Sequence, residues 1–242
     1  MTDRTAHTDI SSTLIVRQLG RIEYDEAHAL QRSLHEQRQH DEIPDTLLLL
    51  EHPRVITMGK KAVDSDVLIS EADQEKLGVQ IRRIERGGET TYHGPGQLVG
   101  YLVFNLYNHG RRIKKFVWNL EESIIRGLEH NWGIESDRSE GRPGIWIGDD
   151  KICALGIAVK QNVTMHGFAL NVHTDLDHFS WIVACGMADK GQTSIARQLA
   201  AEGGSVAAGL ADVAAAMAPV FGNVYGYERV EYRIEGQFGE PY

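Results

Sequence analysis

Three segments of the chain concentrate residues that can take part in chemistry, and the first spans residues 86–97. It holds four glycines and one proline among twelve residues, together with an arginine, a tyrosine and a histidine. Glycine allows backbone conformations that other residues avoid, and it lets a ligand approach the main chain closely. The segment follows neither the P-loop nor the dinucleotide-binding pattern. By composition alone, a substrate-binding loop and a plain connection between two strands are equally open.

The second segment, residues 148–156, places Lys151 directly after a turn and at the start of a run of apolar and small residues. Most lysines are solvated surface groups, so a lone lysine does not by itself indicate a catalytic role. Cys153 stands between an isoleucine and an alanine. This position indicates a small buried hydrophobic residue of a strand and not a reactive thiol.

The third segment, residues 182–187, places Cys185 after an apolar run and before a glycine. Such a position suits a side chain at the end of a helix or strand. A reactive thiol needs a nearby cation or a helix N-terminus that lowers its pKa, whereas a buried structural cysteine needs neither. Taken alone, the segment favours an inert cysteine.

Histidines are the remaining candidates for metal chemistry, since His166, His173 and His178 lie close together in the sequence. Their spacings of seven and five residues fit no compact metal-binding motif, and the His-Glu-x-x-His pattern is absent. Neither of the two cysteines has a close cysteine partner. The sequence therefore predicts no metal site.

Composition restricts the class of protein. The 25 basic and 34 acidic residues give a net charge of −9, which disfavours nucleic acid as a partner. Two cysteines indicate no disulfide framework, and residues 1–12 lack the apolar core of a signal peptide. No apolar run is long enough to span a membrane. We therefore expect a cytoplasmic protein with neither nucleic-acid nor membrane partners.

Hydrophobic periodicity predicts the elements that position these segments. Strands are expected at residues 13–18, 46–50, 79–84, 97–106, 144–147, 152–159 and 163–172. Helices are expected at 24–39, from 113 to just before a glycine at 133, and at 179–183, 193–201 and 205–220. No repeat or linker divides the chain, so residues 13–242 are expected to form one domain behind a disordered polar N-terminus, residues 1–12. The pattern predicts an α+β fold with a mixed, largely antiparallel sheet flanked by helices.

Four blocks, taken together, resemble a known family. Residues 86–97 read Arg-Gly-Gly-x-x-Thr-Tyr-His-Gly-Pro-Gly-Gln, and residues 151–156 read Lys-Ile-Cys-Ala-Leu-Gly. They are followed by His-Gly-Phe-Ala-Leu-Asn at 166–171 and Ala-Cys-Gly-Met at 184–187. Their order and spacing resemble the lipoyl(octanoyl) transferase family, the octanoyl-acyl carrier protein:protein N-octanoyltransferases. The resemblance covers roughly residues 14–220. Four ordered blocks are far more specific than one, so together they favour functional roles for the glycine-rich segment, Lys151 and Cys185.

The resemblance implies a fold shared with the catalytic domains of biotin and lipoate protein ligases, and a role for each block. Cys185 would be the catalytic nucleophile that carries the acyl group as a thioester. Lys151 would face it, lower its pKa and act as the acid and base. The residues implied to bind substrate are Arg86, Gly87, Gly88, Glu89, Thr90, Thr91, Tyr92, His93, Ala154, Leu155, Gly156, Gly167, Phe168 and Ala169. No cofactor and no metal are implied.

The implied reaction transfers an octanoyl group from octanoyl-acyl carrier protein to a specific lysine of lipoyl domains, the first step of endogenous protein lipoylation. The implied acceptors are the lipoyl domains of 2-oxoacid dehydrogenase complexes and the glycine cleavage H protein. Because a thioester donor is already activated, a thiolate attacks it without ATP or a metal, and an amine then drives the reaction to an amide.

Three alternatives stay open. An ATP-dependent lipoate or biotin ligase of the same fold needs no cysteine nucleophile, so Cys185 and the Gly-Pro-Gly after His93 favour the transferase. A non-catalytic lipoyl-binding or scaffold protein is disfavoured by intact Lys151 and Cys185. An amidotransferase that passes octanoyl between two protein lysines is disfavoured by the same two blocks. ATP dependence and donor choice separate these activities.

One basic run stands out in this acidic chain, and its members are Arg111, Arg112, Lys114 and Lys115. A solvated helix face is the simpler explanation. Basic residues at a helix N-terminus oppose the macrodipole, however, at a cost of a few tenths of a kcal/mol each. Since the family resemblance implies acidic protein substrates, we expect this run to be a docking patch.

Overall fold

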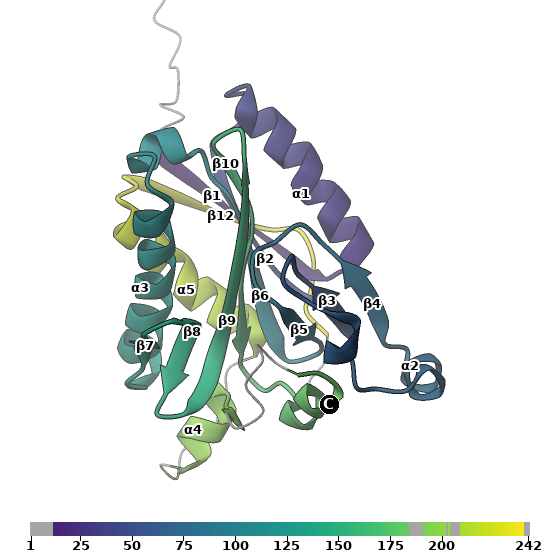
Figure 1. The fold of residues 1–242 in the computed structure, drawn as a ribbon. Helices are drawn as coiled ribbons and strands as arrows, with labels where there is room; N and C mark the ends of the chain where they lie inside the picture. Colours follow the sequence, from purple (N-terminus) through teal and green to yellow (C-terminus); the bar gives the residue numbers. More distant parts are fainter. Residues whose placement is uncertain (1–11, 184–190, 202, 204–208, 240–242) are drawn as a thin grey trace, which may run out of the picture.

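A computed structural model describes residues 12–183, 191–201, 203 and 209–239 of the chain (Figure 1). Residues 1–11 lie outside this description, so the expected disorder of the N-terminus stays a prediction. The block at residues 184–187, which contains Cys185, and part of the helix expected at 205–220 also lie outside it. No helix among the described residues is long and apolar enough to cross a membrane.

The main sheet contains nine strands within the described residues, and eight of them form one continuous path. In spatial order these are β12 (Arg229–Ile234), β1 (Thr13–Arg21), β2 (Asp45–Glu51), β6 (Gln97–Val103), β10 (Val163–Asn171), β9 (Asp150–Lys160), β8 (Arg142–Ile147) and β7 (Asp137–Ser139). The short β11 (Gly191–Gln192) runs parallel to β9. β1 is parallel to both β12 and β2, while the other pairs along the path are antiparallel. The predicted mixed, largely antiparallel sheet is confirmed.

A second, three-stranded sheet carries the glycine-rich segment. Its order is β4 (Gln80–Arg83), β3 (Val55–Met58) and β5 (Thr90–His93), with β3 parallel to β4 and antiparallel to β5. β5 lies inside the segment at residues 86–97, so that segment is both a strand of this sheet and a connection into β6.

Helices cover both faces of the main sheet (Figure 1). On one face α1 (Tyr24–Gln39) packs against β6 and β10, and on the other face α3 (Ile113–Trp132) packs against α5 (Leu210–Tyr225). The remaining helices are α2 (Glu71–Leu77), α4 (Ile195–Ala201) and 3₁₀ turns at Asp64–Asp66, Leu106–His109 and Leu176–Trp181. α3 ends as predicted, because Gly133 adopts φ +66° and its N–H donates to the Glu129 carbonyl.

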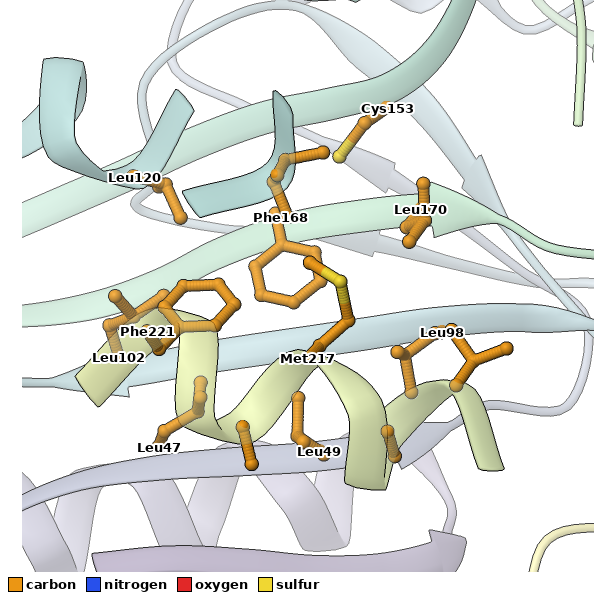
Figure 2. Packing of buried hydrophobic residues seen from close by; sticks show 14 of the residues in the cluster. Leu47, Leu49, Leu98, Leu102, Leu120, Cys153, Phe168, Leu170, Met217 and Phe221 are labelled. Carbon is orange, nitrogen blue, oxygen red and sulfur yellow. The ribbon is translucent and has the colours of Figure 1, made fainter. Parts of the chain in front are cut away.

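Strand β2 shows why the sheet is buried on both sides. Its leucines at residues 47–50 alternate between the two faces. Leu47 and Leu49 join a cluster with Met217 and Phe221 of α5 (Figure 2). Leu48 and Leu50 join a cluster with Ala27 and Leu34 of α1. A continuous apolar run, and not an alternating one, is therefore what this strand requires.

Several predicted boundaries are wrong, each for a local reason. The strand expected at 97–106 ends at Val103, because the Asn105 side chain accepts the Tyr107 N–H and starts a 3₁₀ turn. The helix expected at 179–183 is a 3₁₀ turn at Leu176–Trp181, which begins where Asp175 accepts the Asp177 N–H. Helix α5 runs on to Tyr225, past the end expected at 220, because the first residue that adopts a left-handed conformation there is Gly226.

Asp45 at the start of β2 joins four parts of the chain although it is 1% exposed. One carboxylate oxygen accepts from Arg38 Nε at 2.6 Å and from the Asn105 N–H at 2.8 Å. The other lies 3.0 Å from His109 Nε2 and accepts from the Tyr227 hydroxyl at 2.7 Å. These contacts satisfy a buried charge that would otherwise be costly.

We expect Asp45→Ala to destabilise the fold by about 3–5 kcal/mol, because it leaves the buried Arg38 guanidinium without its buried partner. Asp41→Ala is the matched control. Asp41 also pairs with Arg38, but its side chain is 71% exposed, so its loss should cost less than about 1 kcal/mol. Urea unfolding followed by circular dichroism measures both variants. Equal losses would show that Asp45 does not hold the network together.

Candidate functional site

A cavity of about 390 Å³ lies where the glycine-rich segment meets β9 and β10. Its size falls in the range of about 300–1,000 Å³ that is usual for small-molecule sites. Of the fourteen residues predicted to bind substrate, thirteen line it: Arg86, Gly87, Gly88, Glu89, Thr90, Thr91, His93, Ala154, Leu155, Gly156, Gly167, Phe168 and Ala169. Strand pairing explains this convergence, since Ala154, Leu155 and Gly156 of β9 lie opposite Ala169, Phe168 and Gly167 of β10.

Arg86 fixes the glycine-rich segment at the cavity wall. Its guanidinium donates to the Thr57 carbonyl at 2.7 Å and to the Thr57 hydroxyl at 2.9 Å. The N–H of Gly87 donates to the Ile157 carbonyl of β9 at 2.9 Å. A Cβ atom at Gly156 would lie 3.0 Å from the Gly87 carbonyl oxygen, so a larger residue there would crowd this close approach.

Tyr92 is the one predicted substrate-binding residue that does not line the cavity. Its hydroxyl lies 2.8 Å from His178 Nδ1, and its ring contacts the rings of Phe179 and Trp181 edge to face. Alternation along β5 explains this placement, because Tyr92 points away from the face used by its neighbours Thr91 and His93. Tyr92 therefore ties β5 to the 3₁₀ turn at Leu176–Trp181.

Lys151 lines the cavity at the start of β9 and is 4% exposed. Its ammonium nitrogen lies 4.7 Å from the centroid of the Trp146 ring, a cation–π contact. A Cβ atom at Gly144 would lie 3.3 Å from the Lys151 side chain, so the glycine leaves room for it. Gln192 of β11 pairs with Lys151. Gln192 is seven residues after Cys185 in the sequence. The sequence-based interpretation of Lys151 as a solvated surface group is thus excluded.

The other predicted catalytic residue, Cys185, lies outside the described residues, so its relation to Lys151 stays a prediction. Cys153 is fully buried in the core cluster between α3 and the sheet, and burial raises the pKa of its thiol. The prediction of a small buried hydrophobic residue at position 153 is confirmed.

One wall of the cavity consists of buried aromatic and imidazole groups. Tyr24, His93, Tyr101 and His166 all line it. Burial lowers the pKa of His93 to about 3 and raises that of Tyr101, so both side chains are uncharged at neutral pH. The sequence did not single out Tyr24 or Tyr101, whose only local signal is an aromatic residue within a helix or strand.

Apolar side chains from α3 complete the cavity. Val117 and Leu120 line it from that helix, and Arg142 and Pro143 line it from the start of β8. The cavity therefore combines apolar walls with one buried ammonium and one buried guanidinium. Such a lining can hold an apolar chain and place its reactive end beside a cation.

Comparison with known proteins places these features in one family. The model of the lipoyl protein ligase A/B catalytic domain matches residues 23–221. The chain is 48% identical over 209 residues to an octanoyltransferase of Caldicellulosiruptor saccharolyticus, with 86% of this chain and 87% of the relative covered. It is 45% identical over 223 residues to an octanoyltransferase of Chloroflexus aurantiacus, with 90% and 97% covered.

The fold is also that of a solved ligase. A structure of a bi-partite lipoate protein ligase and its E2 lipoyl domain from Thermoplasma acidophilum matches with a TM-score of 0.63 and 18% identity. The match covers 92% of this chain and 85% of the other. At this identity the likeness concerns the fold, and it agrees with the ligase-like sheet and helices expected from the four blocks.

Proposed function

This chain belongs to the lipoyl protein ligase A/B catalytic domain family and is an octanoyltransferase, and we propose that its donor is octanoyl-acyl carrier protein. The acceptor is a specific lysine of a lipoyl domain, in 2-oxoacid dehydrogenase complexes or the glycine cleavage H protein. Residues 13–242 act as one catalytic domain in the cytoplasm. The single observation that supports this most is the buried Lys151 in a cavity lined by two further family blocks.

The proposed reaction has two steps, and both pass through Cys185. The Cys185 thiolate attacks the carbonyl carbon of the donor thioester. The bond to the carrier sulfur breaks, and the leaving carrier thiolate takes a proton from the Lys151 ammonium, which becomes a neutral amine. In the second step the acceptor amine attacks the Cys185 thioester. Its proton goes to the neutral Lys151 amine, and the amide forms as the Cys185 thiolate leaves.

The cavity supports each part of this proposal. Apolar groups such as Leu155, Phe168 and Val117 suit an eight-carbon chain, because burial of its methylenes is favourable. The ammonium of Lys151 stands at the same cavity and favours a thiolate over a thiol nearby. Neither step needs ATP, since the energy of the amide comes from the thioester.

The function is tested by mixing the protein with octanoyl-acyl carrier protein and a lipoyl domain that lacks the modification. Without ATP, the lipoyl domain should gain one octanoyl mass in intact mass spectrometry. Free octanoate with ATP should give no product. Product from octanoate and ATP alone would identify a ligase, and product from an octanoylated lipoyl protein alone would identify an amidotransferase.

The basic run gains aromatic neighbours in the folded protein. Arg111 lies 3.9 Å from the centroid of the Tyr107 ring, and Lys115 lies 3.9 Å from the centroid of the Trp118 ring. Tyr107, Ile113 and Trp118 are between 40% and 50% exposed. Trp118 follows Val117, which lines the cavity. Helix α3 therefore carries both part of the basic run and part of the cavity wall. We propose that acidic protein substrates dock here.

We expect reversal of this run to glutamate to raise the apparent KM for octanoyl-acyl carrier protein by roughly tenfold and to flatten its salt dependence. The reversed residues are Arg111, Arg112, Lys114 and Lys115. Turnover of a small octanoyl thioester with a minimal amine should stay unchanged, because the cavity is untouched. A control variant reverses the exposed Arg32, Lys76 and Lys160 on other elements. Equal KM values for the run variant and the wild type would mean that the run is only a solvated helix face.

A further inference from the structure

Three side chains from distant parts of the sequence converge next to the cavity. His28 comes from α1, Glu85 follows β4, and His166 lies on β10. Their ring nitrogens and carboxylate oxygens all lie within 4.8 Å of one another. Nε2 of His28 is 3.1 Å from one oxygen of Glu85, and Nε2 of His166 is 3.8 Å from the other. The octanoyl transfer proposed above uses none of the three.

Among these three residues, His166 has a buried ring nitrogen without a hydrogen bond. The residue is 2% exposed, and its Nε2 atom has no hydrogen-bond partner. A buried polar atom left in this way costs about 1–3 kcal/mol. The backbone N–H of His166 donates to the Gln31 side chain at 2.9 Å, which helps to hold the ring where it is. A ligand between His166 and Glu85 would satisfy the buried nitrogen.

The donor set selects a class of ligand. The imidazole ring of a histidine offers a nitrogen lone pair to a metal ion. Two imidazoles and one carboxylate form a set that binds Zn²⁺ and related divalent transition metals, with the fourth position left for water. Metal–ligand bonds of about 2.1 Å in a tetrahedron place ligand atoms about 3.4 Å apart. The separations of 3.1 Å and 3.8 Å run to different oxygens of Glu85, and the ligand atoms of the three residues lie within 4.8 Å of one another, so the side chains need to move inward to hold one ion.

We propose that His28, Glu85 and His166 bind one divalent transition-metal ion of the Zn²⁺ class. The rings of His28 and His166 are stacked with centroids 5.6 Å apart, so both imidazoles lie beside the Glu85 carboxylate. The ion links α1, the residue before Arg86 and the middle of β10. It therefore braces the part of the cavity wall that holds His166 and Arg86.

The experiment titrates Zn²⁺ into the chelator-treated full-length protein in competition with a chromophoric zinc chelator. All proteins carry Cys185→Ala, so that a thiol ligand at this position contributes nothing. We expect one equivalent to bind, and His28→Ala or Glu85→Gln to weaken binding at least tenfold. His130→Ala, which removes an exposed histidine from α3, is the matched control and should bind like the parent. Circular dichroism checks that each variant is folded.

X-ray absorption at the zinc edge gives a second readout that does not depend on activity. The expected spectrum has two imidazole ligands and additional oxygen ligands. The proposal is overturned if the parent binds no stoichiometric zinc, or if His28→Ala and Glu85→Gln bind as tightly as His130→Ala. In either case the three residues form a cluster of polar side chains that binds no metal. The octanoyl transfer assay is scored separately, so failure of one proposal leaves the other standing.

Discussion

Cys185→Ala is expected to lower octanoyl transfer by roughly three orders of magnitude or more, because the variant has no nucleophile to carry the acyl group. With donor and no acceptor, the wild-type protein should gain one octanoyl mass that hydroxylamine removes. The variant should gain none. Intact mass spectrometry with peptide mapping measures the label and its position.

Cys153→Ala is the matched control, since it removes the only other thiol of the chain. Cys153 is fully buried, and burial raises the pKa of its thiol, so it is a poor nucleophile. We expect this variant to accept the label and to transfer it, with some loss of stability because the core loses a sulfur atom. A label mapped to Cys153 in the wild type would contradict the assignment of Cys185.

Lys151→Arg is expected to lower transfer to the acceptor by about 10²–10⁴-fold, the usual contribution of a general acid and base. The guanidinium keeps a positive charge but stays protonated, so it cannot accept the proton of the attacking amine. Alkylation of Cys185 by iodoacetamide should continue, because that reaction needs only a nearby charge. Single-turnover kinetics from the octanoylated protein measures the transfer step by itself.

Two further variants separate charge, proton transfer and packing at this position. Lys151→Met fills similar space without charge, so it should lose both transfer and rapid alkylation. Lys160→Arg, at the exposed end of the same strand, should change neither. Circular dichroism shows whether the buried arginine is tolerated beside Trp146. Near-normal turnover by a folded Lys151→Arg protein would refute the acid and base role.

Prediction from the sequence worked where the deciding interactions are local. The apolar face of α3 and the left-handed Gly133 that ends it are set by residues a few positions apart, and both are confirmed. β2 was recognised because a strand buried on both faces needs a continuous apolar run. The edge strand β12 was missed, because Arg229–Ile234 is polar and partly exposed and pairs with Thr13–Arg21 at the opposite end of the sequence.

The candidate site, like the fold, was predicted from the sequence only in part. The four ordered blocks identified the family, since residues with chemical roles tolerate few replacements in type or spacing. They also named thirteen of the residues that line the cavity, although alternation in β5 turns Tyr92 away from it. The blocks could not reveal Tyr24 or Tyr101, whose local patterns are those of ordinary core aromatics.

The sequence by itself determined several local elements, such as α3 and β2, and the family to which Lys151 and the glycine-rich segment belong. Only the tertiary structure decided that Lys151 is buried against Trp146, and that His28, Glu85 and His166 meet. The reason is physical. Local periodicity records which face of a helix or strand is buried, whereas the neighbours of a buried side chain depend on strand pairing between residues far apart in the chain.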